Sequence, residues 1–138
     1  DIQITEFDIQ VPDFSEELLA QYARDFLLAV FSHSKTVGVI TWLGGMPIRE
    51  IQTSHRSARS QCAFFRDDWS IKPIGQVWLD LKEKEWNTRV CGRTDSHGRF
   101  RTRGFQGQYQ VSVQRGNDSR MARFQLGKNA EVVSILFD

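Results

Sequence analysis

The strongest constraint on the fold is a run of apolar residues at helical spacing near the start of the chain. These residues recur every three or four positions, as on one side of an α-helix: Leu18, Leu19, Tyr22, Ala23, Phe26, Leu27, Val30 and Phe31. Asp13 or Ser15 can cap the start of this helix, and Glu16 and Glu17 suit the positive end of its dipole. Because the opposite side is polar, the helix must pack its apolar side on a sheet or on another helix.

The segments on either side of this helix have the character of β-strands. Residues 2–8 alternate, so that one face of a strand would carry Ile2, Ile4, Glu6 and Asp8. The run Val37 to Trp42 is apolar on both faces, which is typical of a buried parallel strand. Strand, helix and strand in this order predict a βαβ unit.

A long irregular stretch from Gly44 to about Ile71 follows, and stretches of that length are usually functional or disordered. Pro73 then suits the first turn of a second helix, which ends near Trp86. The apolar stripe of this second helix comprises Ile74, Val77, Trp78 and Leu81.

The pattern changes at Asn87 to short alternating runs that are separated by turn residues. About five such runs are present, and they predict a small all-β sandwich: Thr88–Thr94, Arg99–Arg103, Gln108–Gln114, Arg120–Leu126 and Glu131–Phe137. The charge changes at the same place, because residues 1–86 hold 9 Lys and Arg against 13 Asp and Glu, whereas residues 87–138 hold 9 against 4. We therefore expect two domains, 1–86 and 87–138.

Four motifs in the first part resemble, in order, the glycoside hydrolase family 10 endo-1,4-β-xylanases. They are Ile2-Gln3-Ile4-Thr5-Glu6-Phe7-Asp8, Ala29-Val30-Phe31-Ser32-His33, Val37-Gly38-Val39-Ile40-Thr41-Trp42 and Asp68-Trp69-Ser70-Ile71-Lys72-Pro73. The second part is similar to the carboxypeptidase-regulatory or transthyretin-like β-sandwich, through residues 92–100 and 107–111. The resemblance implies an α/β plus all-β chain: strands seven and eight of a TIM (β/α)8 barrel with their helices in 1–86, and a small β-sandwich accessory module in 87–138.

This resemblance implies a retaining glycosidase that acts on xylan or a related β-glycan. Glu6 would be the catalytic nucleophile, Asp8 would support it, and Trp42 would stack on a sugar ring. The family's acid/base residue has no counterpart here, so we expect the isolated chain to be inactive. The segment Leu43 to Arg49 departs from the family pattern.

The alternative is a non-catalytic module that binds a polysaccharide or a protein. In neither case does the sequence imply a cofactor, a metal, nucleic acid or a membrane, since His33, His55 and His97 share no ligand spacing. The three arginines Arg99, Arg101 and Arg103 are interpreted as a solvated strand face. Cys62 and Cys91 permit one disulfide or two free thiols. The resemblance alone implies an extracellular or periplasmic location, and the oligomeric state is left open.

Overall fold

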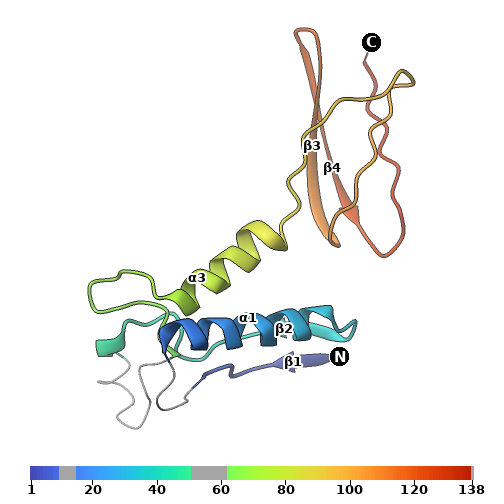
Figure 1. Ribbon diagram of the computed structural model, residues 1–138. Coiled ribbons are helices and arrows are strands. Elements are labelled where there is room, and N and C mark those ends of the chain that lie inside the picture. Colours follow the sequence, from blue (N-terminus) through green and yellow to red (C-terminus); the bar gives the residue numbers. More distant parts are fainter. Residues whose placement is uncertain (10–14, 51–61, 138) are drawn as a thin grey trace. The chain divides into compact units, whose positions relative to one another are not determined.

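The computed structural model describes residues 1–9, 15–50 and 62–137, and it divides the chain into two compact units (Figure 1). Unit 1 comprises Asp1–Glu85 and unit 2 comprises Trp86–Asp138. Helices belong to unit 1, and the described part of unit 2 contains strands and irregular segments.

Unit 1 begins with the βαβ arrangement that the sequence predicts. Strand β1 (Ile2–Ile4) pairs in parallel with β2 (Thr36–Val39), and helix α1 (Glu16–Ser32) connects them. The pairing continues past both strands, because the Ile40 amide donates to the Ile4 carbonyl at 2.8 Å and the Phe7 amide donates to the Ile40 carbonyl at 2.9 Å.

Helix α1 begins where the sequence offers a capping side chain. The Ser15 hydroxyl accepts a hydrogen bond from the Leu18 amide at 3.2 Å, which satisfies one of the free donors of the first turn. Asp13, the other candidate, lies outside the described residues. At its other end α1 stops at His33, whose backbone is extended and whose amide donates to the Val30 carbonyl at 3.2 Å.

The second predicted helix is also present and packs beside α1. Helix α3 (Pro73–Asp80) starts with proline in its first turn and continues as a π-helical segment, η2 (Leu81–Glu85). The Arg24 guanidinium of α1 makes two hydrogen bonds to the Glu85 carboxylate of η2, at 2.6 and 2.8 Å. This bidentate pair fixes α1 against the end of the second helix.

The core of unit 1 lies between α1, α3 and the segment after β1. Its buried residues are Ile9, Leu19, Ala23 and Ile74, with Phe7, Phe64 and Trp78 packed around them. Phe7 stacks on Phe26 with ring centroids 4.4 Å apart, and Phe64 lies 5.4 Å from Trp78. A smaller cluster of Leu43, Cys62 and Ala63 is covered by Ile48.

The prediction of a TIM-barrel portion is wrong. Within the described residues the structure is small, with few helices and two separate two-stranded sheets, which is not the architecture of a barrel. The second strand is not the buried strand that its composition suggests, since Val37 is 63% exposed and Ile40 is 49% exposed. Unit 1 is a small α/β unit with a two-stranded parallel sheet.

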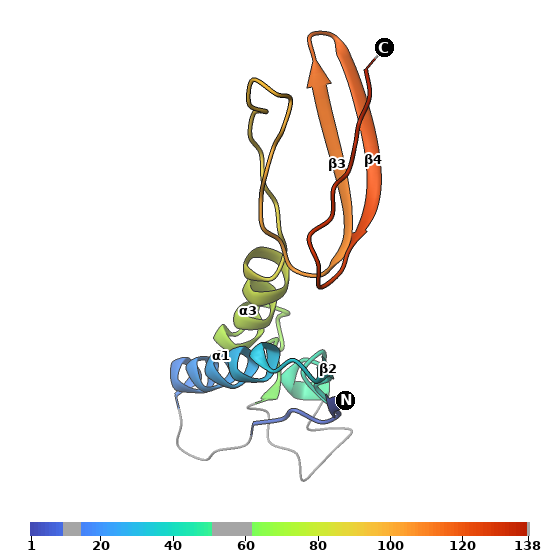
Figure 2. The ribbon, with the colours of Figure 1, turned by 90° about the vertical axis from the view of Figure 1, so that its right-hand side faces the viewer.

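The described part of unit 2 contains a β-hairpin, formed by β3 (Gly107–Arg115) and β4 (Asp118–Leu126), and the segments 88–105 and 127–137 run beside it (Figure 2). The strands are antiparallel and in register from Gly107–Leu126 to Arg115–Asp118. The two-residue turn begins with Gly116 at φ +59°, a backbone conformation that suits glycine at the first position of a hairpin turn. On one face of the hairpin, Tyr109 stacks on Phe124 with ring centroids 5.4 Å apart.

The prediction of a β-sandwich in unit 2 is wrong as well. Two of the five alternating runs form strands, while 88–94, 99–103 and 131–137 are extended without strand pairing. Their apolar side chains do not form a buried inner face, because Val132 is 92% exposed and Leu136 is 83% exposed. A turn at Asp95 separates the first two runs: the Asp95 carboxylate accepts from the amides of His97 and Arg99, at 2.9 and 2.8 Å.

Candidate functional site

The polar residues at the ends of β1 and β2 are joined through the Asp8 carboxylate. Its Oδ1 accepts hydrogen bonds from the Thr41 hydroxyl at 3.1 Å and the Trp42 amide at 3.3 Å. The Thr41 hydroxyl in turn accepts from the Gly44 amide at 3.2 Å. Asp8 therefore stabilises the turn that follows β2. This role is structural, because the hydrogen-bond donors of the Asp8 carboxylate are a hydroxyl and a backbone amide of the chain itself.

The three residues that the sequence singled out are only partly brought together. Asp8 is bonded to the backbone of Trp42, whose side chain is 57% exposed. Glu6 is exposed and makes no hydrogen bond or ion pair within the described part of the chain. The predicted roles of Glu6, Asp8 and Trp42 as nucleophile, supporting carboxylate and sugar platform stay predictions, and they are not carried into the function proposed below.

A second polar cluster, which the sequence analysis missed, centres on Glu16 at the start of α1. The Glu16 carboxylate is bonded to the Arg66 guanidinium and lies 3.8 Å from the Lys72 ammonium. Arg66 also donates to the Ile71 carbonyl at 3.0 Å. The cluster thereby ties the segment before α3 to the first turn of α1. Sequence carries no signal for it, because Glu16 and Arg66 are 50 positions apart.

Two buried ionisable side chains lie near these clusters. Burial lowers the pKa of Lys72, an effect that the Glu16 carboxylate partly offsets. Burial also raises the pKa of the Cys62 thiol to about 11, and the negative charge of Asp8 adds to that shift. A thiol with a raised pKa is a poor nucleophile at neutral pH, so Cys62 acts as a packed core residue. Cys62 and Cys91 are both free thiols in the structure.

The remaining candidates do not form a site for a metal or for chemistry. No group of three or more His, Cys, Asp and Glu side chains that could hold a metal occurs in the described residues. His33 accepts a hydrogen bond on Nδ1 from the Lys35 amide at 3.2 Å, His97 lies in the Asp95 turn, and His55 falls outside the described residues. Across residues 1–9, 15–50 and 62–137, no helix combines the length and the apolar character needed to cross a membrane.

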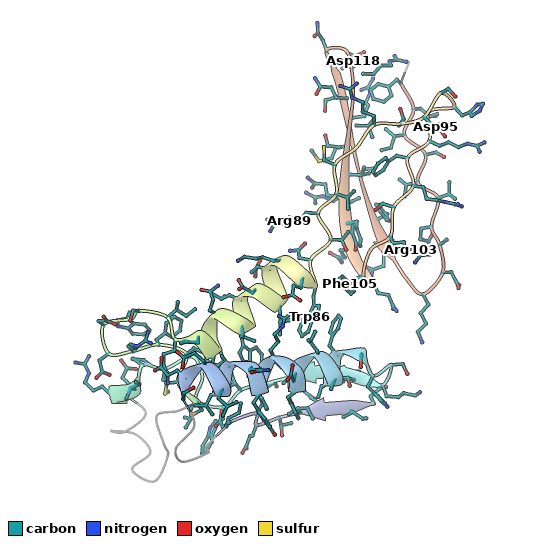
Figure 3. All side chains as sticks on the ribbon, viewed as in Figure 1. Trp86, Arg89, Asp95, Arg103, Phe105 and Asp118 are labelled. Carbon is teal, nitrogen blue, oxygen red and sulfur yellow. The ribbon has the colours of Figure 1, made fainter. Side chains whose placement is uncertain are left out.

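Unit 2 is the more basic part of the chain, with nine Lys and Arg against four Asp and Glu. Arg99, Arg101 and Arg103 are all exposed, but the segment that carries them is not a strand, so they do not share a strand face as the sequence predicts. Figure 3 shows the side chains around the labelled Arg89, Asp95 and Arg103. The Asp95 carboxylate bonds the backbone amides of its own turn.

Comparison with known proteins finds a similarity to part of one regulatory protein, an anti-sigma factor. The chain is 33% identical over 112 residues to the anti-sigma-I factor RsgI6 of Acetivibrio thermocellus. The match covers 81% of this chain and 13% of the relative, so the chain spans a small part of that protein. Neither a family model nor a solved structure matches the chain.

The similarity extends over both units. Unit 1 contains 85 residues and unit 2 contains 53, so a match of 112 residues includes at least 27 residues of unit 2 and at least 59 of unit 1. The part of the relative that matches therefore corresponds to residues of both units.

These findings correct the prediction of a family 10 xylanase fragment followed by a transthyretin-like module. The relative carries the name of a regulator rather than of a glycosidase, which contradicts the predicted enzyme class, xylan degradation and the polysaccharide partner. The alternative of a polysaccharide- or protein-binding module gains no support either. The motifs that carry the resemblance correspond to a βαβ unit that ends in polar residues. Because a local fold of this kind occurs in proteins of many functions, these motifs do not identify the function. The extracellular or periplasmic location came from the same resemblance and stays a prediction.

Proposed function

We propose that this chain is part of a regulatory protein of the anti-sigma-I type, and that the protein acts by binding a sigma factor. The observation that carries the proposal is the 33% identity to RsgI6 over 112 residues, which includes parts of both units. A function through protein binding requires surfaces rather than a catalytic constellation. The polar clusters of unit 1 are compatible with it, because Asp8 and Glu16 are engaged in holding turns and helix ends.

The test uses the complete open reading frame that contains these residues, together with the sigma-I-type factor of the same organism. Binding is measured by calorimetry, and inhibition is measured as loss of sigma-dependent transcription by reconstituted RNA polymerase. We expect a complex at micromolar or tighter affinity and at least a tenfold loss of transcription from the cognate promoter. A vegetative sigma factor from the same organism serves as the matched control and should keep its activity.

The opposite result is equally clear. If the complete protein binds none of the sigma-I-type factors of its organism, and leaves transcription with each of them unchanged, the proposal is wrong. The protein must be shown to be folded in that experiment by a cooperative thermal transition, so that the absence of binding reports on function.

A further inference from the structure

The outer edge of β4 presents a row of unpaired backbone groups. In an antiparallel hairpin the residue pairs alternate between hydrogen-bonded and non-hydrogen-bonded, and a two-residue turn is closed by a hydrogen-bonded pair, here Arg115–Asp118. The residues of the other pairs direct their N–H and C=O groups away from the partner strand. On β4 these residues are Ser119, Met121, Arg123 and Gln125.

Nothing in the described chain pairs with these groups. None of the four residues has a backbone hydrogen bond outside the hairpin, and all four are exposed, Met121 to 62%. Figure 2 shows β4 on the side of β3 that faces away from the segment 88–105. A nine-residue strand with an open edge is a ready template for another strand, and natural proteins usually shorten or cover such an edge.

The charge of the hairpin indicates what kind of strand would bind there. Residues 107–128 carry four basic side chains and one acidic side chain, and the whole of unit 2 carries nine against four. Arg120 and Arg123 of β4 project from opposite faces, because they are an odd number of positions apart. The Arg123 Nε also donates to the Gln110 Oε1 across the hairpin at 3.2 Å. A strand added beside β4 would therefore have an arginine of β4 on each face, and this positive charge favours an acidic segment.

The same charges disfavour a second copy of this chain as the occupant. In a two-fold antiparallel pairing centred near the middle of β4, the Arg123 side chains of the two copies would lie on one face and close together. Like charges in such positions are destabilising. The outer edge of β4 therefore suits a strand from a different molecule better than the same strand of a second copy.

We propose that the outer edge of β4 binds an extended, acidic segment of a protein partner, which adds to the hairpin as a third strand. Main-chain hydrogen bonds to Ser119, Met121, Arg123 and Gln125 supply the affinity, and Arg120 and Arg123 select for acidic side chains. The inference is independent of the anti-sigma proposal, since it rests on the register, exposure and charge of the hairpin.

The probe is a ten-residue peptide of alternating valine and glutamate, with a valine–lysine peptide of the same length as control. Binding to the full chain is followed by fluorescence anisotropy, and hydrogen exchange of backbone amides is followed by NMR. We expect the glutamate peptide to bind at least tenfold more tightly than the lysine peptide. It should also slow exchange at Met121 and Arg123 at least tenfold.

Two proline variants test the edge itself, because Met121 and Ser112 face each other across a non-hydrogen-bonded pair. Met121→Pro removes an outward N–H from β4, and Ser112→Pro removes the equivalent N–H from β3. Binding should fall at least tenfold in Met121→Pro and stay within twofold in Ser112→Pro. If proline unfolds the hairpin, the double variant Arg120→Glu/Arg123→Glu replaces it and should reverse the preference between the two peptides.

Three outcomes would overturn the proposal: equal affinity for both peptides, protection of amides elsewhere but not on β4, or an unchanged preference in the charge-reversed variant. A dimer in sedimentation analysis whose β4 amides are already protected would assign the edge to a second copy, and would overturn it too.

Discussion

At the scale of single residues, the Cys62 thiol shows how burial sets chemistry. Its pKa is raised to about 11 in the folded chain, against an ordinary value of 9.0, mainly because a thiolate would lose its hydration in the cluster with Leu43 and Ala63. The unfolded chain ionises this thiol from about pH 9 upward, while the folded chain keeps it neutral. Cys62 therefore stabilises the fold fully below about pH 9, and this contribution is lost as the pH rises toward 11.

Comparison with Cys62→Ala isolates this effect, because alanine does not titrate. We expect the free energy of unfolding of the parent chain to fall by about 2 kcal/mol, relative to the variant, between pH 8 and pH 10.5. Urea titrations under reducing conditions at both values measure the difference. Cys91→Ala, at an exposed position, serves as the control for the removal of a thiol. If the stability of the parent chain and that of Cys62→Ala respond equally to pH, the Cys62 thiol ionises as easily in the folded chain as in the unfolded chain, which contradicts the prediction.

At the scale of elements, the start of α1 depends on one local hydrogen bond. Ser15→Ala removes the acceptor for the Leu18 amide and should lower the free energy of unfolding by about 1 kcal/mol. Ser32→Ala, at the other end of the same helix, removes a hydroxyl that donates to the Ala29 carbonyl and should cost about 0.5 kcal/mol or less. Urea unfolding followed by circular dichroism compares the two. A larger loss in Ser32→Ala would mean that the C-terminal end of α1 limits its stability.

The elements that could be predicted from sequence are those with local causes. Periodicity and a capping side chain predict α1, and alternation in Gln108–Gln114 and Arg120–Leu126 predicts the strands β3 and β4. The alternation in 88–94 and 131–137 predicts strands that do not form, because alternation says nothing about pairing, which needs a partner strand distant in sequence. The cluster of Glu16, Arg66 and Lys72 was missed for the same reason. Glu16 lies 50 positions from Arg66, and no periodic pattern connects residues so far apart.

At the scale of the whole molecule, the fully buried apolar residues of the described chain all belong to unit 1. They run from Ile9 to Leu81, whereas the hairpin face with Tyr109 and Phe124 is only half-buried. A unit of about 50 residues with so little buried surface is at the margin of independent stability. Unit 2 is thus the part of the chain whose folded state would be stabilised most by a strand that adds to β4.

Separate expression of residues 1–85 and 86–138 tests this division of stability. We expect the first piece to unfold cooperatively within about 5 °C of the transition of the whole chain, since a loss of about 1 kcal/mol shifts such a transition by that amount. The second piece should show poorly dispersed amide signals in NMR spectra, because local turns at Gly116 and Asp95 cannot replace a buried core. Adding the acidic strand peptide should disperse those signals, since binding to the folded form alone shifts the equilibrium toward it. A well-dispersed spectrum and a cooperative transition of 86–138 without any peptide would show that the hairpin and its extended segments are sufficient for a stable fold.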